Sequence, residues 1–245
     1  MCGPMHFNDQ ADLYRRSRPS YPADLWRRVR ATGLVGPGYR ALDLGAGTGE
    51  ATGPLLEEGM DVVAVEPGPE LAKILAATHP DAELLVSRAE DIEFADSSFD
   101  LVVAATSVHW MDLDILLPKV HRVLRHRGRL LLWRNVFGDS TVGVTPFRVE
   151  VERIVRRRQT ARPGNPEDAG VTADKLTRAG LFTVDEICAY QWSISLDANQ
   201  IHSLFSTFSD WASHEVDDAT AAVRALGGQV VEHYMSWLIV ASPRR

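Results

Sequence analysis

The sequence predicts an α/β fold in which a mainly parallel β-sheet carries helices on both faces. Over the first half of the chain, short apolar runs alternate with longer amphipathic segments, a pattern typical of successive β-α-β units. The 245 residues, 45% of them hydrophobic, suit one large α/β domain with a core of its own. Since β-α-β crossovers are right-handed, this pattern also determines how the helices wind around the sheet.

Seven strands are expected in all. The first five are buried runs at residues 41–44, 61–65, 83–86, 101–105 and 129–133. Helices at 48–58, 70–78 and 115–125 connect them, as the spacing of their apolar residues indicates. The last two strands are a long β-branched and aromatic segment at 183–196 and a final segment at 230–240.

Two segments interrupt this regular alternation. Residues 137–170 contain a basic amphipathic helix at 146–159, and residues 197–228 have a helical pattern. As insertions after the fifth and sixth strands, both are expected to form a helical lid over the carboxyl edge of the sheet, where open α/β sheets bind ligands. The chain is expected to be a single domain over 1–245, with residues 1–32 as an N-terminal helical cap.

Composition limits the classes of partner. Lys and Arg total 26 and Asp and Glu total 33, which gives a net charge of −7 and argues against nucleic acid as a partner. Only Cys2 and Cys188 are present, too few for a disulfide framework or a structural zinc site. Without a signal peptide or a membrane span in the pattern, we expect a cytoplasmic protein with no membrane partner. A monomer and a homodimer both remain open.

The segment Asp43-Leu44-Gly45-Ala46-Gly47-Thr48-Gly49 joins the first strand to a helix. Its three glycines let the backbone turn sharply and approach a ligand closely. A dinucleotide fingerprint would need a glycine where Glu50 stands, and a carboxylate there would repel a pyrophosphate. Asp43 is equally unsuited to phosphate but suits a ligand that carries an ammonium group. The loop therefore indicates a nucleoside ligand without phosphates.

Two further positions fit a nucleoside. Glu66 and Pro67 follow the second strand, and the Glu66 carboxylate can accept hydrogen bonds from both ribose hydroxyls. Ala89-Glu90-Asp91 follows the third strand and could bind the edge of an adenine ring. A solvent-exposed acid at a strand end is the alternative interpretation of Glu66.

Taken together, these motifs resemble those of the class I S-adenosylmethionine (SAM)-dependent methyltransferases, in particular the small-molecule branch that includes trans-aconitate methyltransferase-like and type 11 methyltransferases. The matching stretches are 41–49, 66–67, 89–92, 98–102 and 127–130. The resemblance implies a Rossmann-like seven-stranded sheet and SAM as cofactor, with S-adenosylhomocysteine (SAH) as product. It also implies that the glycine loop holds the methionine part, Glu66 the ribose, and Ala89 with Glu90 the adenine.

The resemblance extends to two other stretches. Residues 14–22 are similar to an N-terminal Y…RP-x-YP signature, which implies that Tyr14 and Arg18 close over the cofactor, with Arg18 facing its carboxylate. Thr106-Ser107-Val108-His109-Trp110 is similar to the motif after the fourth strand, which adds Thr106 to the cofactor site. Two residues depart from the family pattern. Arg88 stands where an acid is common and Glu93 where a proline is common, and both weaken the adenine assignment.

His109 is the candidate general base, because it follows the fourth strand and an imidazole titrates near neutral pH. A pocket-lining role is the alternative for it. Trp110, Trp192 and Tyr234, together with His109, are the candidate substrate contacts, since small-molecule sites are mostly apolar. Packing in the core of the lid is the alternative interpretation of the aromatic residues. Asp112 is expected to cap a helix rather than bind a metal, and no metal site is expected.

The sequence thus favours an enzyme that moves a methyl group from SAM to an O, N or C atom of a small-molecule metabolite. One alternative is a SAM-fold protein that catalyses cyclisation or elimination and keeps SAM as a structural or electrostatic cofactor. A nicotinamide oxidoreductase and a non-catalytic SAM-binding protein are the others. The sequence does not identify the methyl acceptor.

Overall fold

The computed structural model describes residue 8, residues 10–158 and residues 168–244. The chain divides into two compact units, which are described separately. The sheet unit comprises Ser20–Asn135, Pro166–Tyr190 and Ser236–Arg245. The helical unit comprises Met1–Pro19, Val136–Asn165 and Gln191–Met235. Parts of the expected N-terminal cap and of the expected 137–170 insertion, namely residues 1–7, 9 and 159–167, lie outside the described residues.

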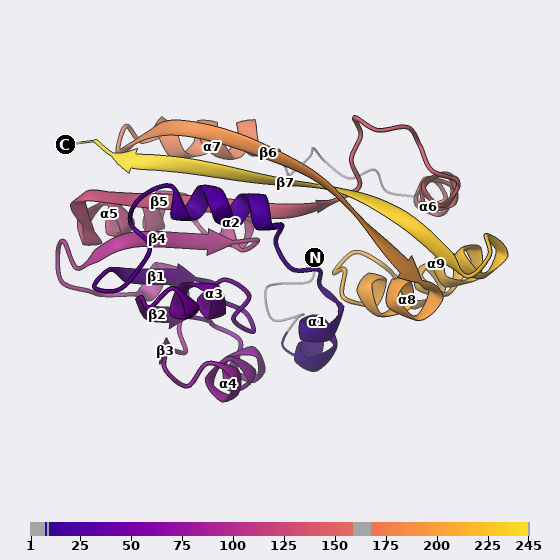
Figure 1. The fold of residues 1–245 in the computed structure, drawn as a ribbon, viewed down its shortest axis with the longest axis horizontal. Coiled ribbons are helices and arrows are strands. Elements are labelled where there is room, and N and C mark those ends of the chain that lie inside the picture. Colours follow the sequence, from indigo (N-terminus) through magenta and orange to yellow (C-terminus); the bar gives the residue numbers. More distant parts are fainter. Residues whose placement is uncertain (1–7, 9, 159–167, 245) are drawn as a thin grey trace. The chain divides into compact units, whose positions relative to one another are not determined.

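The sheet has seven strands in the order β3-β2-β1-β4-β5-β7-β6. The strands are β1 (Arg40–Leu44), β2 (Asp61–Val65), β3 (Glu83–Leu85), β4 (Phe99–Ala105), β5 (Leu124–Phe137), β6 (Phe182–Asp197) and β7 (Gln229–Pro243). The pairs β1–β2, β2–β3, β1–β4 and β4–β5 are parallel, whereas β7 runs in the opposite direction to β5 (Figure 1). The expected mainly parallel, seven-stranded sheet is confirmed.

The helices of the sheet unit lie between successive strands along the chain, except for the first, which precedes β1. They are α2 (Ala23–Arg30), α3 (Thr52–Glu57), α4 (Pro69–Thr78), α5 (Leu113–Val123) and α7 (Ala169–Arg178), with short 3-10 helices η2 (Ala89–Asp91) and η3 (Val108–Trp110). The expected capping role of Asp112 is confirmed, since its side chain accepts a hydrogen bond from Asp114 N at 3.1 Å at the start of α5. None of the described helices is long and apolar enough to cross a membrane.

Buried side chains of the strands form the core of the sheet unit. The central strands are apolar on both sides, as parallel strands covered by helices must be. Trp133 on β5 is fully buried and meets the rings of Trp26 and Tyr21 edge to face, at 5.6 and 5.8 Å between centroids. Leu101 and Val103 of β4 lie in the same core. This core holds the strand ends in place, and the loops that follow those ends form the candidate site.

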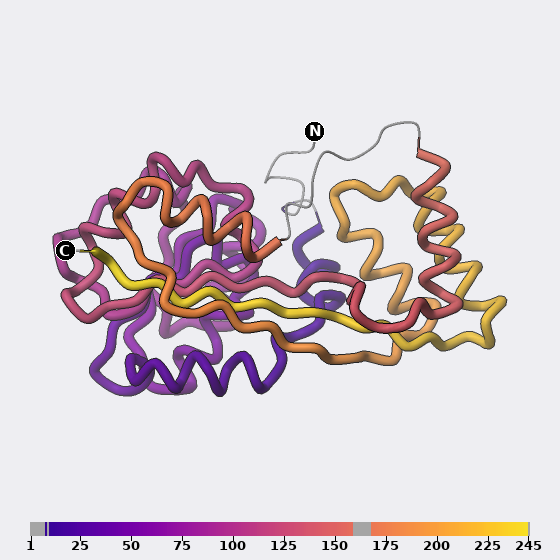
Figure 2. Tube along the Cα trace, turned by 90° about the horizontal axis from the view of Figure 1, so that it is seen from above, coloured from indigo at the N-terminus to yellow at the C-terminus, as the bar shows by residue number. Residues whose placement is uncertain are grey.

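The helical unit contains α1 (Ala11–Ser17), α6 (Pro146–Arg156), α8 (Ala198–Ser206) and α9 (Ser213–Ala225). Figure 2 shows α6, α8 and α9 grouped together. They share an apolar core whose fully or almost fully buried members include Phe147, Ile201, Phe205 and Val223. The unit therefore has a hydrophobic core of its own, separate from that of the sheet unit.

Three element boundaries differ from the sequence-based expectation. The helix expected at 48–58 begins only at Thr52, because Gly49 has a φ of 100°, which a helix does not accept. The fifth strand is much longer than expected, Leu124–Phe137. The helical segment 197–228 is two helices, since the first ends at Ser206 and the second begins at Ser213, where Glu215 Oε2 accepts from Ala212 N at 2.9 Å.

Candidate active site

The glycine loop crosses the carboxyl end of β1. The amides of Gly45 and Ala46 both donate to Val65 O, at 2.8 and 3.0 Å, which ties the loop to the end of β2. Gly45 and Gly47 have φ values of 67° and 61°, a region that favours glycine. A β-carbon at Gly45 would also lie 2.6 Å from Cβ of Ser107. Both backbone conformation and close packing therefore require glycine at the first position of the loop.

Glu66, directly after β2, is hydrogen-bonded to the glycine loop. One carboxylate oxygen accepts from Gly47 N at 2.9 Å and the other from Gly68 N at 2.8 Å. The residue is 6% exposed, and its burial raises the pKa of the carboxyl group although the two amide hydrogen bonds oppose this. Each oxygen keeps a second lone pair for a ligand. Pro67, between Glu66 and Gly68 in the chain, is partly buried.

Asp43 is fully buried at the end of β1. One carboxylate oxygen accepts from Thr52 Oγ1 at 2.7 Å, and the other has no hydrogen-bond partner among the described residues. Burial raises the pKa of Asp43 to about 7, and the negative charges of Glu50 and Glu66 add to that increase. Three carboxyl groups thus surround the glycine loop, which favours a cationic ligand and disfavours a phosphate.

Ala89 and Glu90 lie on η2, after β3, and both are buried. Glu90 Oε1 accepts from Asp112 N at 2.8 Å and lies 3.2 Å from the guanidinium of Arg88. Burial acts to raise the pKa of Glu90, but these contacts outweigh it and the pKa is lowered. Arg88, whose side chain is mostly exposed, is therefore the ion-pair partner of Glu90, which explains one departure from the family pattern.

The segment after β4 places the remaining candidates of the sheet unit. Thr106 has a left-handed φ of 58°, its amide donates to Trp133 O at 2.8 Å, and its hydroxyl lies 2.9 Å from the hydroxyl of Tyr21. His109 is exposed on η3, with its ring 4.8 Å from that of Trp110. These residues follow the strand directly beside β1, so they share an edge of the sheet with the glycine loop.

Tyr21 and Ser107 also contribute contacts at this edge of the sheet, although neither was a candidate from the sequence. The Ser107 hydroxyl donates to Leu44 O at 2.6 Å, which connects the end of β4 to the end of β1. Tyr21 belongs to the Y-P signature at the N-terminus, and that signature was the signal that could have indicated a role for it.

The other four candidates lie in the helical unit. Arg18 donates to Thr207 O at 3.1 Å, and its guanidinium lies 5.0 Å from the ring centroid of Tyr14. Trp192 and Tyr234 stack on each other at 4.5 Å with an interplanar angle of 18°. Because the glycine loop belongs to the sheet unit, the expected contacts of these residues with cofactor and substrate remain predictions.

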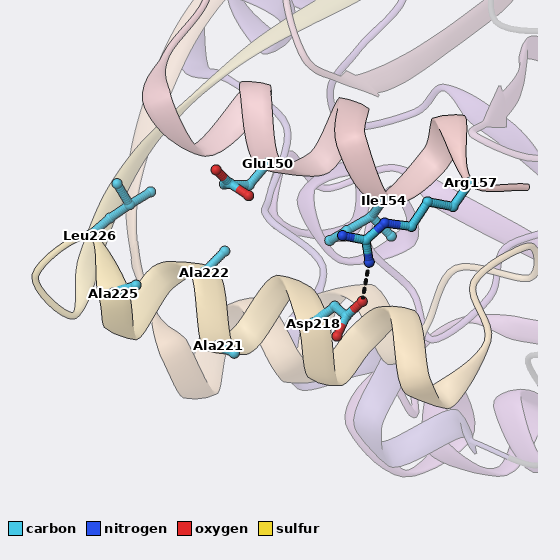
Figure 3. A pocket seen from close by; sticks show the side chains of 8 residues that line it. All are labelled: Glu150, Ile154, Arg157, Asp218, Ala221, Ala222, Ala225 and Leu226. Carbon is cyan, nitrogen blue, oxygen red and sulfur yellow. Dashed lines mark hydrogen bonds and ion pairs between the residues drawn. The ribbon is translucent and has the colours of Figure 1, made fainter.

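An open hollow of about 370 Å³ lies between α6 and α9 (Figure 3). Its lining residues are Glu150, Ile154, Arg157, Asp218, Ala221, Ala222, Ala225 and Leu226. Arg157 and Asp218 form an ion pair at 3.1 Å across it. The hollow contains none of the candidate site residues, so we assign it no part in the chemistry.

Comparison with known proteins defines the class. Residues 42–132 match the family model described as a methyltransferase domain. An uncharacterized methyltransferase of Mycobacterium tuberculosis is 43% identical over 206 residues, which cover 84% of this chain and 77% of the relative. The crystal structure of a putative type II methyltransferase from Anaeromyxobacter dehalogenans has a TM-score of 0.65 and 26% identity, covering 92% of this chain and 97% of that one.

Two relatives have more specific names. A demethylmenaquinone methyltransferase of Renibacterium salmoninarum is 35% identical over 135 residues, 54% of this chain and 55% of that protein. A phosphoethanolamine N-methyltransferase of Haemonchus contortus, solved with phosphomonomethylethanolamine and SAH, shares the fold at 15% identity and a TM-score of 0.57, covering 100% of this chain and 61% of that one.

The fold and these matches place the protein among methyl-transferring enzymes of the α/β class. The chain belongs to the class I SAM-dependent methyltransferases.

Proposed function

We propose that the protein transfers a methyl group from SAM to an O, N or C atom of a small-molecule metabolite. The observation that carries this proposal is the anchored position of Glu66, held by two amides on either side while retaining acceptor capacity for the two ribose hydroxyls. The R. salmoninarum and H. contortus relatives, by their names, act on small molecules, which supports the substrate class.

We assign the other parts of the cofactor to the remaining candidate residues. Asp43 and the loop residues Gly45, Ala46, Gly47 and Gly49 would face the methionine part, whose ammonium and sulfonium groups are cationic. The carboxyl groups of Asp43, Glu50 and Glu66 around the loop favour that charge. Pro67, Ala89, Glu90 and Thr106 would complete the nucleoside pocket, and Tyr14 with Arg18 would meet the cofactor's carboxylate.

SAM supplies an activated methyl group on a sulfonium. As the acceptor's lone pair forms a bond to the methyl carbon, the carbon–sulfur bond breaks and its electron pair stays on sulfur, which leaves neutral SAH sulfur. Alignment of the two molecules can contribute about 7–11 kcal/mol of barrier reduction. His109 would take the proton that the acceptor loses, and Trp110, Trp192 and Tyr234 would line the acceptor's pocket.

Two features of this proposal concern the whole chain. The segments 137–170 and 197–228 would act as a lid that excludes water during transfer. The low cysteine content supports a cytoplasmic location, where thiols remain reduced.

Titration calorimetry with SAM and with NAD tests the cofactor assignment. We expect SAM to bind, NAD not to bind, and Glu66→Gln to weaken SAM binding at least tenfold, since glutamine cannot accept from both amides. Glu57→Gln, an exposed acid on α3, is the matched control and should bind SAM normally. Unchanged SAM affinity in Glu66→Gln would contradict the ribose assignment, and absence of SAM binding by the unaltered chain would contradict the proposal.

Methyl-labelled SAM with a metabolite extract, followed by mass spectrometry, tests the reaction itself. Label should appear in a small molecule. Product formation without label transfer would instead favour cyclisation or elimination.

A further inference from the structure

Thr106 has a backbone conformation that threonine rarely adopts. Its φ of 58° lies in the left-handed region, where a β-branched side chain makes the conformation costly. Such a conformation persists only where the surrounding contacts enforce it, and it is concentrated at functional sites. Thr106 directly follows β4, at the edge of the sheet that carries the glycine loop. The contacts that hold Thr106 therefore bear on the candidate site.

Two contacts restrain Thr106 in this conformation. Its amide donates to Trp133 O at 2.8 Å, and its hydroxyl lies 2.9 Å from the hydroxyl of Tyr21. The first is a backbone hydrogen bond that any residue except proline can make. The second requires a hydroxyl on both side chains. Tyr21 therefore supplies the restraint that depends on residue type.

Tyr21 is itself held in place by the core of the sheet unit. Its ring meets that of Trp133 edge to face at 5.8 Å between centroids. The next residue, Pro22, is the N-cap of α2 and its carbonyl accepts from the amides of Leu25 and Trp26, whose side chains are buried. The Tyr21 hydroxyl thus has a fixed position relative to the end of β4.

The residue after Thr106 meets the glycine loop directly. The Ser107 hydroxyl donates to Leu44 O at 2.6 Å, and the Ser107 carbonyl accepts from Trp110 N at 3.0 Å, at the end of η3. A β-carbon at Gly45 would lie 2.6 Å from Ser107 Cβ, so the two segments approach closely. A change of φ at Thr106 would move all of Ser107 and break its hydrogen bond to Leu44.

We propose that Tyr21 is a positioning residue for the cofactor loop, because its hydroxyl keeps Thr106 in the left-handed conformation. That conformation in turn holds Ser107 against the first glycine of the loop. In this role Tyr21 acts on the loop through Thr106 and not by contact with SAM. The inference rests on the proposed function, since it takes the glycine loop as the SAM site, and it adds a residue from the segment before α2 to that site.

Titration calorimetry of SAM with Tyr21→Phe tests the role of the hydroxyl. The variant keeps the ring on Trp133 and removes only the oxygen, so SAM should bind about tenfold more weakly as Thr106 leaves its costly conformation. Tyr39→Phe, which alters another partly buried tyrosine packed against the same core, is the matched control and should bind SAM normally. Unchanged SAM affinity in Tyr21→Phe would overturn the inference.

Changes at Thr106 separate the proposed role from the loss of a hydrogen bond alone. Glycine adopts a left-handed φ without penalty, whereas valine removes the same hydroxyl but keeps the branched side chain. In a Tyr21→Phe background, Thr106→Gly should therefore raise SAM affinity roughly fivefold, and Thr106→Val should not raise it. Equal SAM affinities of the two double variants would contradict the inference, since both lack the same hydroxyl and differ in backbone preference.

The unaltered chain separates failure of this inference from failure of the proposed function. If the unaltered chain binds SAM and Tyr21→Phe binds it equally well, only the positioning role is wrong. A lower melting temperature of Tyr21→Phe with unchanged SAM affinity would likewise show that the hydroxyl is merely structural. Absence of SAM binding by the unaltered chain would contradict the proposed function, and the inference with it.

Discussion

The buried carboxyl group of Asp43 makes the stability of the protein depend on pH in a predictable way. Its pKa is raised from an ordinary value near 3.8 to about 7, because burial disfavours the charged form and Glu50 and Glu66 add like charge. The folded protein therefore holds this proton more tightly than the unfolded chain. The resulting stabilisation is fully present below pH 3.8 and is lost as the pH rises through about 7.

The size of this effect follows from the two pKa values. Between them, each pH unit lowers the free energy of unfolding by about 1.4 kcal/mol. Because the native group is itself half ionised near pH 7, the loss from pH 5 to pH 7 is about 2 kcal/mol, and the loss over the whole range is about 4 kcal/mol. Asparagine at this position does not titrate, and its side-chain oxygen can still accept from Thr52.

Urea unfolding of the unaltered chain and of Asp43→Asn at pH 5, 6 and 7 measures the effect. The quantity to compare is the difference in unfolding free energy between the two chains, in which titration of groups common to both, such as Glu232, largely cancels. We expect this difference to shift by about 2 kcal/mol in favour of the variant between pH 5 and pH 7. A difference that stays constant with pH would refute the burial of a protonated Asp43.

Three further predictions follow from particular contacts. Gly53→Ala should be destabilising, because a β-carbon there would lie 2.6 Å from Cε1 of His79. In a His79→Ala background the same change should instead stabilise the helix by up to about 1 kcal/mol. Thermal melts of the unaltered chain, both single variants and the double variant measure this, and equal effects of Gly53→Ala in the two backgrounds would show that there is no clash. Arg158→Ala should cost about 3 kcal/mol in urea unfolding at pH 7, since it removes both bonds to the buried Glu215, at 2.7 and 2.9 Å. Arg156→Ala, which loses only an exposed pair with Glu152, is its control and should cost less than about 0.5 kcal/mol; equal costs would contradict the burial argument. His109→Ala should slow single-turnover methyl transfer more than it weakens SAM binding, and the base assignment is wrong if SAM binding collapses while the single-turnover rate is unchanged.

The strand-loop-helix unit at the glycine loop was predictable from local sequence. Runs of β-branched residues at 61–65 and the glycines at 45, 47 and 49 determine their own conformations, because side-chain sterics and backbone freedom act within a few residues. The Asp112 cap is of the same kind, since its partner, Asp114 N, is two residues away. Glu66 was also predictable, because it directly follows a recognisable strand.

Contacts between distant segments were not predictable in this way. From the sequence, Arg88 is only a departure from a family pattern. In the structure it forms an ion pair with Glu90, whose carboxylate also accepts a hydrogen bond from Asp112 N. Glu232, which is fully buried on β7, was overlooked because an isolated acid in a strand resembles an exposed one, and only its burial and its ion pair with Arg148 distinguish it. The relevant signal was the alternation of Glu232, Tyr234 and Ser236 along one face of β7.

The sequence by itself determined the order of strands and helices, the glycine loop, and the acid that follows the second strand. These are local properties, since period, propensity and turn chemistry are read over short windows of the chain. The tertiary structure alone decided which buried polar groups have partners and which do not. Burial and pairing depend on residues more than 80 positions apart, such as Arg148 and Glu232, and desolvation by those distant neighbours sets the pKa values of Asp43 and Glu232.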